Sequence, residues 1–179
     1  MKRILAALSL FALAGCVTVH TTDELKAIFD HGVAEYDAGH YAEAFKLFQS
    51  IDDEDVAAMR NEGLMLRKGL GVEKDPEAAE DMLRRAAEAG LPTAQYDLAE
   101  MLLNGEAGAP DPKAALPWLM SAAAAHHPIA EYRLAILYEE GTAIDQDIET
   151  ARKLYADAAA RGVPGAAERL ARLPAPANP

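Results

Sequence analysis

Residues Ala57–Pro92 read AAMRNEGLMLRKGLGVEKDPEAAEDMLRRAAEAGLP, and the next two segments repeat their pattern. Thr93–Pro128 reads TAQYDLAEMLLNGEAGAPDPKAALPWLMSAAAAHHP, and Ile129–Pro164 reads IAEYRLAILYEEGTAIDQDIETARKLYADAAARGVP. The period is 36 residues without a gap, and each unit closes on a proline. A fixed period of this length predicts stacked helical units, each of which buries its apolar face against its neighbours.

Each unit predicts two helices, a helix A and a helix B. In helix A of the second unit, Leu98, Ala99 and Leu102 share one face at helical spacing. A glycine ends helix A where a left-handed residue is favoured, and an aspartate caps helix B. These positions are Gly69 and Asp75, Gly105 and Asp111, and Gly141 and Asp147. The expected buried stripe of helix B in the first unit is Ala79, Leu83, Ala86 and Ala87, and small residues there allow close helix packing.

These residues resemble the Sel1-like repeat, a relative of the tetratricopeptide repeat. The loop Gly69-x-Gly71-Val72-x-x-Asp75 carries the full family pattern, whereas the later units have Ala107-Gly108 and Ala143-Ile144 at the second glycine and the valine. The resemblance implies an all-α fold, a right-handed α-solenoid with three repeats over residues 57–164. It implies function only as protein–protein interaction, because a fold by itself does not specify a site.

The repeats are flanked by a predicted cap on each side. In residues 23–56, Gly39-x-Tyr41-x-x-Ala44-x-x-x-Phe48 resembles the second helix of a tetratricopeptide repeat and predicts an N-terminal capping unit, with Asp23 or Thr22 as the first helix cap. Residues 165–179 predict a capping helix and then a disordered tail from Leu173, because LPAPANP cannot continue a helix.

The first residues predict an address in the cell envelope. Residues 1–15 have a basic start and a short apolar run, as a signal peptide does, and the run is too short for a membrane-spanning helix. Leu13-Ala14-Gly15-Cys16 resembles the lipobox of bacterial lipoproteins, which implies lipidation of Cys16 followed by a tether over residues 16–22. An ordinary signal peptide with an incidental cysteine is the alternative. Val17, where an aspartate signals inner-membrane retention in enteric lipoproteins, favours the outer membrane.

The charge of the chain restricts its partners. The formal net charge is −12, so we expect no binding to nucleic acid and no membrane contact other than through the lipid anchor. An acidic groove favours a basic or extended peptide from another envelope protein. We expect no cofactor.

The sequence shows no constellation that predicts catalysis or metal binding. Adjacent His126 and His127 are interpreted as turn residues rather than as ligands, and Asp52–Asp55 as a solvated turn that places acid at a helix start. Cys16 is the only cysteine, which excludes disulfides. Cys-rich relatives have been linked to penicillin binding or hydrolysis, so an enzyme acting on cell-wall peptide or β-lactam is the alternative function, although their paired cysteines are missing here. A structural spacer without a specific ligand is a third interpretation.

Candidate partner-binding residues lie on helix A, away from its buried stripe, because a solenoid binds along the concave face that these helices form. Tyr96 and Tyr132 share one repeat position with Arg60, and we expect their rings on one surface, or else partly buried between helices. The candidates are Arg60, Tyr96, Asp97, Glu100, Tyr132, Arg133, Ile136 and Glu140, with Asn61 and Asn104 beside them.

One residue conflicts with the helical pattern. Pro117 lies about six residues inside helix B of the second unit, where it removes a backbone donor and clashes with the preceding turn. The sequence therefore predicts a kink or a local opening next to Trp118.

Overall fold

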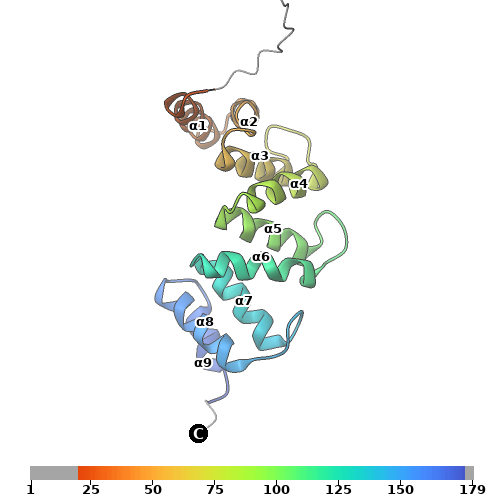
Figure 1. The fold of residues 1–179 in the computed structure, drawn as a ribbon, viewed down its shortest axis with the longest axis vertical. Coiled ribbons are helices and arrows are strands. Elements are labelled where there is room, and N and C mark those ends of the chain that lie inside the picture. The colour runs from red at the N-terminus through yellow and green to blue at the C-terminus, as the bar shows by residue number, and fades with distance from the viewer. Residues whose placement is uncertain (1–19, 176–179) are drawn as a thin grey trace, which may run out of the picture.

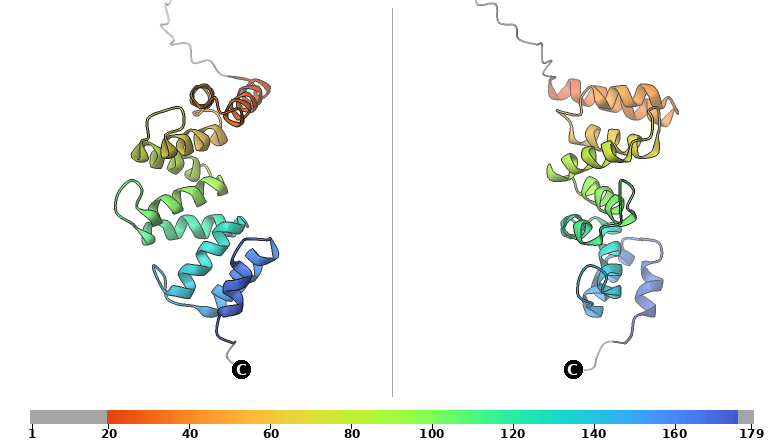
Figure 2. Two further views of the ribbon diagram at one scale, coloured as in Figure 1. Left: turned by 180° about the vertical axis from the view of Figure 1, so that it is seen from behind. Right: turned by 90° about the vertical axis from the view of Figure 1, so that its right-hand side faces the viewer.

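A computed structural model describes residues 20–175, and within this range the chain forms helices only, stacked one after another from end to end (Figures 1 and 2). The predicted signal peptide, Cys16 and the chain up to Val19 lie outside the described residues, as do residues 176–179. The helices are α1 (Thr22–Asp37), α2 (Tyr41–Gln49), α3 (Val56–Lys68), α4 (Pro76–Glu88), α5 (Pro92–Asn104), α6 (Pro112–Ala124), α7 (Pro128–Glu140), α8 (Ile148–Ala160) and α9 (Ala166–Arg172).

The helices form the predicted all-α solenoid. Each helix packs mainly on its neighbours in the chain. The pairs α3–α4, α5–α6 and α7–α8 are the three repeats, α1 and α2 form the N-terminal capping unit, and α9 closes the C-terminal end (Figure 1). The first helices of the successive units, α1, α3, α5, α7 and α9, are called the A helices below.

The predicted helix signals of the repeats are confirmed. Gly69, Gly105 and Gly141 follow the last residues of α3, α5 and α7 in left-handed conformations. The aspartates before α4, α6 and α8 accept hydrogen bonds from the first free backbone N–H groups, at about 3 Å. These are Asp75, Asp111 and Asp147.

The core is built largely from alanine. The stripe of α4 is at most 1% exposed, and its equivalents on α6 and α8 are buried or nearly so. On α8, Tyr155 replaces the leucine of the other two stripes and is fully buried. The small residues allow neighbouring helices to approach closely, so a few large side chains in each unit fill the remaining space.

Both ends of the fold differ from the predicted boundaries. The first helix is capped by Thr21, not by Asp23 or Thr22. The Thr21 hydroxyl oxygen accepts from the Glu24 N–H, and the Glu24 carboxylate at the third helical position accepts from the Thr21 N–H, which completes a capping box. His20, Thr21 and Thr22, which were assigned to the tether, therefore belong to the fold. At the other end Leu173 is buried against Tyr155 and its neighbours, so the assigned tail begins one residue too early.

The predicted local opening at Pro117 is wrong, and the alternative, a kink, stays a prediction. Helix α6 runs from Pro112 to Ala124 without interruption. Pro117 and Lys113, whose carbonyl loses its helical partner, are both on the exposed side of α6, where water can satisfy that carbonyl. Trp118 packs between the apolar clusters of the first and second repeats.

The turn between α6 and α7 contains both histidines of the pair, as predicted. His126 has a φ of 60° in that turn, where the other two repeats have Gly90 and Gly162. His127 is the N-cap of α7, and its Nδ1 accepts a hydrogen bond from the Ala130 N–H at 3.2 Å. Asp55 caps α3 in the same way, as the acidic turn before it predicted.

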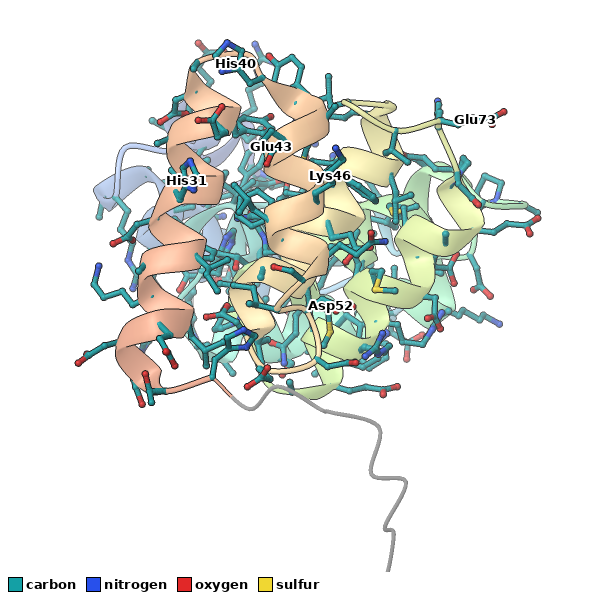
Figure 3. The ribbon with its side chains drawn as sticks, turned by 90° about the horizontal axis from the view of Figure 1, so that it is seen from above. His31, His40, Glu43, Lys46, Asp52 and Glu73 are labelled. Atoms are coloured by element: carbon teal, nitrogen blue, oxygen red, sulfur yellow. The ribbon has the colours of Figure 1, made fainter. Side chains whose placement is uncertain are left out.

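The two edges of the stack carry different turns. The turn from the capping unit to the first repeat, with Asp52, lies on the edge of the stack where α1 begins, called the entry edge below (Figure 3). The loops inside the units lie on the opposite edge, with His40 and Glu73 (Figure 3). At the entry edge, the His20 N–H and ring bind Glu54 at 3.0 and 2.7 Å, and these hydrogen bonds lower the pKa of the Glu54 carboxyl. The first described residue is thereby fastened to the α2–α3 turn.

Candidate protein-interaction surface

Four of the candidate binding residues form ion pairs between A helices. Arg60 on α3 donates from Nε to Asp97 on α5 at 2.6 Å. Arg133 on α7 donates through two nitrogens to both oxygens of Glu100 on α5, each at 2.6 Å. A bidentate pair of this kind fixes both side chains, so these residues join successive repeats.

Burial strengthens the structural role of these pairs. The Asp97 side chain is only 10% exposed, and burial raises the pKa of its carboxyl while Arg60 opposes the rise. The hydrogen bonds to Glu100 raise the pKa of the Arg133 guanidinium. A partner would have to break these pairs to reach their charges. The pairs therefore favour a structural role, holding neighbouring A helices together, for Arg60, Asp97, Glu100 and Arg133.

Two further ion pairs extend this ladder and were not among the candidates. Arg67 at the end of α3 binds Glu106 beyond α5, and Arg169 on α9 binds Glu139 on α7 at 2.9 Å. Glu139 also accepts a hydrogen bond from the buried Tyr155 hydroxyl at 2.5 Å. The sequence separations differ, 39 and 30 residues, so a search at the repeat period does not reveal the partners.

Tyr96 and Tyr132 are half-buried and each ring contacts another ring. Tyr96 stacks on His127 with ring centroids 4.9 Å apart and planes 21° apart. Tyr132 packs obliquely on Tyr155 at 5.7 Å. Burial raises the pKa of Tyr96 and lowers that of His127, so the stacked imidazole is neutral over a wider pH range. The equivalent positions thus serve partly as spacers between helices, while part of each ring stays accessible.

The remaining candidates range from half-buried to exposed. Ile136 and Asn61 are half-buried, as the two tyrosines are, and Asn104 is exposed. The Glu140 side chain is 50% exposed, with Arg169 3.8 Å away.

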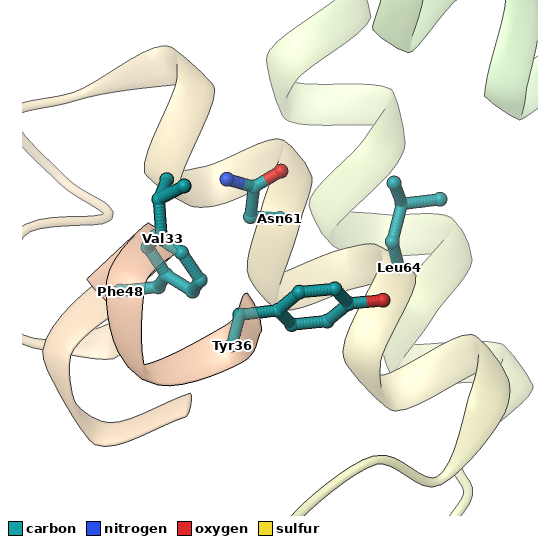
Figure 4. A pocket seen from close by; sticks show the side chains of 5 residues that line it. All are labelled: Val33, Tyr36, Phe48, Asn61 and Leu64. Carbon is teal, nitrogen blue, oxygen red and sulfur yellow. The ribbon is translucent and has the colours of Figure 1, made fainter. Parts of the chain in front are cut away.

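An apolar cavity lies where sequence analysis placed no site. It measures about 260 Å³ and is lined by Val33 and Tyr36 of α1, Phe48 of α2, and Asn61 and Leu64 of α3 (Figure 4). Only Asn61 was among the positions considered. No periodic copy of the capping unit exists in the chain, so the repeat pattern could not show what α1 and α3 enclose between them.

Within residues 20–175, no three histidine, cysteine or acidic side chains gather as they would around a metal ion. None of the helices in that range combines the length and apolar character needed to cross a bilayer.

Comparison with known proteins gives the family of the chain. The Sel1 repeat matches residues 56–91, 92–127 and 128–163, one residue earlier than the units quoted above. A Sel1 repeat protein from Oxalobacter formigenes is 33% identical with a TM-score of 0.75, over 79% of this chain and 58% of that one. The protective antigen c5321 of uropathogenic Escherichia coli, which has an SLR fold, is 26% identical with a TM-score of 0.75, over 82% of this chain and 32% of that one.

These comparisons identify the fold of the chain but not a specific activity or partner. The chain spans less than two thirds of the length of either solved structure, and no functionally curated protein matches it. The family matches nevertheless extend over more than half of the chain, from the start of α3 to the residue after the α8 turn. The chain therefore belongs to the Sel1 repeat family.

Proposed function

We propose that this protein is a lipid-anchored scaffold of the bacterial cell envelope that binds another protein or peptide along its A helices. Sel1 repeat proteins generally mediate protein–protein interaction, and three Sel1 repeats account for most of the described fold. The observation that carries the proposal is the combination of these repeats with Leu13-Ala14-Gly15-Cys16, which resembles a lipobox. The anchor faces the periplasm, and Val17 favours the outer membrane.

The A-helix surface suits a partner with apolar or aromatic contacts and positive charge. Tyr96, Tyr132 and Ile136 offer partly exposed apolar groups, and Glu140 offers an acidic one. The inter-repeat ion pairs hold these side chains in line, which reduces the entropy lost on binding. The net charge of −12 favours a basic partner.

The address can be tested at the single cysteine. We expect wild-type protein to take up labelled fatty acid and to fractionate with membranes, and Cys16→Ala to do neither, because the thiol is the attachment atom. Both forms should be expressed in the native envelope and compared after detergent partition. Absence of label in the wild-type protein contradicts the anchor but leaves the repeat surface unaffected.

The binding surface can be tested with Tyr96→Ala combined with Tyr132→Ala. We expect the double variant to bind the partner captured by crosslinking in the native envelope about 2 kcal/mol more weakly, because aromatic anchors dominate such interfaces. Met120→Ala on α6 is the control, since Met120 is an exposed apolar side chain away from the A helices. Thermal unfolding of each variant separates loss of binding from loss of fold, and unchanged binding by an intact double variant would place the partner elsewhere.

A further inference from the structure

The A helices are joined by ion pairs along the repeats but not at the capping unit. Arg60–Asp97 joins α3 to α5, Arg133–Glu100 joins α5 to α7, and Arg169–Glu139 joins α7 to α9. Among the described residues no ion pair joins α1 to α3. Helix α2 has 9 residues where α4, α6 and α8 have 13, so it covers less of the space between its neighbours. The cavity described above lies at this junction.

The cavity has a rigid floor and an apolar wall. Phe48 at its base is 1% exposed and contacts Phe29 of α1 with ring centroids 5.7 Å apart. Gly32 allows this packing, because a Cβ at that position would lie 2.7 Å from the Phe48 ring. Val33, Tyr36 and Leu64 form the sides, and Asn61 is the polar lining residue, with its amide drawn beside the pocket in Figure 4.

The size of the cavity selects a single side chain. Pockets for drug-sized ligands measure about 300–1,000 Å³ and enclose most of the ligand, whereas this one measures about 260 Å³ and is open on one side. An apolar residue of leucine size fits, and the amide of Asn61 can bind the backbone next to it, since an amide both donates and accepts hydrogen bonds.

The charge around the cavity selects the neighbours of that residue. On α1, Asp30 and Asp37 lie three residues before and four residues after Val33, so both flank it on the helix surface, and both are exposed. Asp30 is paired with Lys26 on the same helix, whereas Asp37 has no ion-pair partner among the described residues. On α3, Arg60 and Arg67 are neutralised by Asp97 and Glu106, which leaves Lys68 as the exposed basic residue near this end of the helix. The excess of acidic charge extends over the whole molecule.

We infer that the cavity between α1 and α3 binds a linear segment of a partner protein that carries one bulky apolar residue between basic residues. The inference rests on the proposed binding function and specifies where its anchor sits. The apolar side chain fills the space over Phe48, the basic residues lie near Asp37 and compete with Lys26 for Asp30, and the segment contacts the capping unit and the first repeat together. Binding therefore closes the one A-helix junction that lacks an ion pair among the described residues.

The test uses the protein from His20 onward and the peptide acetyl-KKLKK-amide, followed by amide chemical shifts in NMR titrations. We expect saturable shifts centred on α1 and α3, at least tenfold weaker binding by acetyl-KKAKK-amide because the apolar anchor is removed, and no saturable binding by acetyl-EELEE-amide. Absence of saturable shifts with the first peptide, or shifts that map to the repeats beyond α4, overturns the inference. Shifts at α1 and α3 that depend on protein concentration without peptide would show a second copy as the occupant and overturn it as well.

A matched pair of variants tests the cavity itself. Asn61→Trp places a large ring over the opening and should weaken acetyl-KKLKK-amide at least tenfold, whereas Met120→Trp, at an exposed position on α6, should change it less than twofold. Equal effects of the two variants overturn the assignment, and if Asn61→Trp does not fold, the shift map of the unmodified protein decides. In a folded Asn61→Trp variant, loss of the peptide site with intact capture of the native partner contradicts this inference alone, whereas loss of both supports it. Failure of the unmodified protein to capture any partner contradicts the proposed function.

Discussion

Gly71→Ala should destabilise the protein by about 3 kcal/mol, the largest effect expected from adding one methyl group. Gly71 has a φ of 73°, and a Cβ there would lie 2.3 Å from the Tyr41 carbonyl carbon and 2.4 Å from the Ala42 nitrogen. These atoms belong to the backbone at the start of α2, which cannot turn away as a side chain can. The left-handed conformation costs a non-glycine residue about 1–2 kcal/mol, and overpacking adds typically 1–3 kcal/mol.

Gly90→Ala is the matched control for this effect. Gly90 has a φ of 89° but nothing within 4 Å of the added Cβ, so it should show the conformational cost alone, about 1 kcal/mol. Both variants should be unfolded in urea and followed by circular dichroism and by fluorescence of Trp118, the one tryptophan, which packs in the repeats. In Gly71→Ala we expect the capping unit to unfold first, so part of the ellipticity is lost before the fluorescence changes. Equal losses for the two variants would show that the contact with α2 adds nothing.

Glu62→Leu should stabilise the protein by about 2 kcal/mol at pH 8 and by much less at pH 4.5. Glu62 is 3% exposed on α3, in the position that Leu98 and Leu134 hold in the other repeats. Its Oε1 accepts a long hydrogen bond of 3.4 Å from Gln49, and its Oε2 has no partner among the described residues. Arg85, whose positive charge opposes the rise in the pKa of Glu62, is already bound to Asp53 at 2.8 Å.

The pH dependence follows from the direction of the pKa shift. Burial and the charge of Asp52 raise the pKa of Glu62 from 4.5 to about 7. Below pH 4.5 the carboxyl is protonated in both the folded and the unfolded chain, so it costs the fold little. Between pH 4.5 and 7 the unfolded chain loses its proton first, so the free energy of unfolding falls as the pH rises, and above pH 7 the penalty is complete. One pKa unit corresponds to about 1.4 kcal/mol, and partial solvation reduces the total to about 2 kcal/mol.

The measurement is the difference in free energy of unfolding between Glu62→Leu and wild type across this pH range. Carboxyls with lowered pKa values, such as Glu54 and Asp147, stabilise the fold in both proteins above their unfolded pKa and cancel in the difference. For Glu62→Gln the difference from wild type should rise over the same pH range, with a smaller gain, because this variant keeps a buried polar group. A difference that does not change with pH would show that Glu62 is ionised in a solvated setting.

The sequence predicted the repeats well because their signals are local. A glycine that must be left-handed, an aspartate that caps the next helix and an alanine stripe depend on residues a few positions apart, so Gly69, Asp75 and Ala79 could be placed from the chain alone. The candidate surface depended on which long side chains meet across repeats. Arg60 binds Asp97, 37 residues later, and Arg133 binds Glu100, 33 residues earlier. Which residues pair depends on the length and direction of the side chains, so residues expected to be free are paired.

The cavity at the capping unit could not be predicted for a related reason. Its walls come from one unit with a tetratricopeptide-like pattern and one with a Sel1 pattern, so no repeat in this chain shows how the two fit. The signals that could have drawn attention to the junction were the shorter second helix of the capping unit and Glu62 at a leucine position. Both mark it as different from the junctions between repeats.

The contact between His20 and Glu54 determines how the molecule bears a mechanical load. If the chain is anchored at Cys16, the four residues to His20 allow a leash of at most about 14 Å. A pull on that leash is divided at His20 between α1, which begins two residues later, and the turn in front of α3, which Glu54 belongs to. Part of the force therefore passes through Glu54 into the turn before α3. Less of it passes through the short helix α2, so the capping unit is less easily separated from the first repeat.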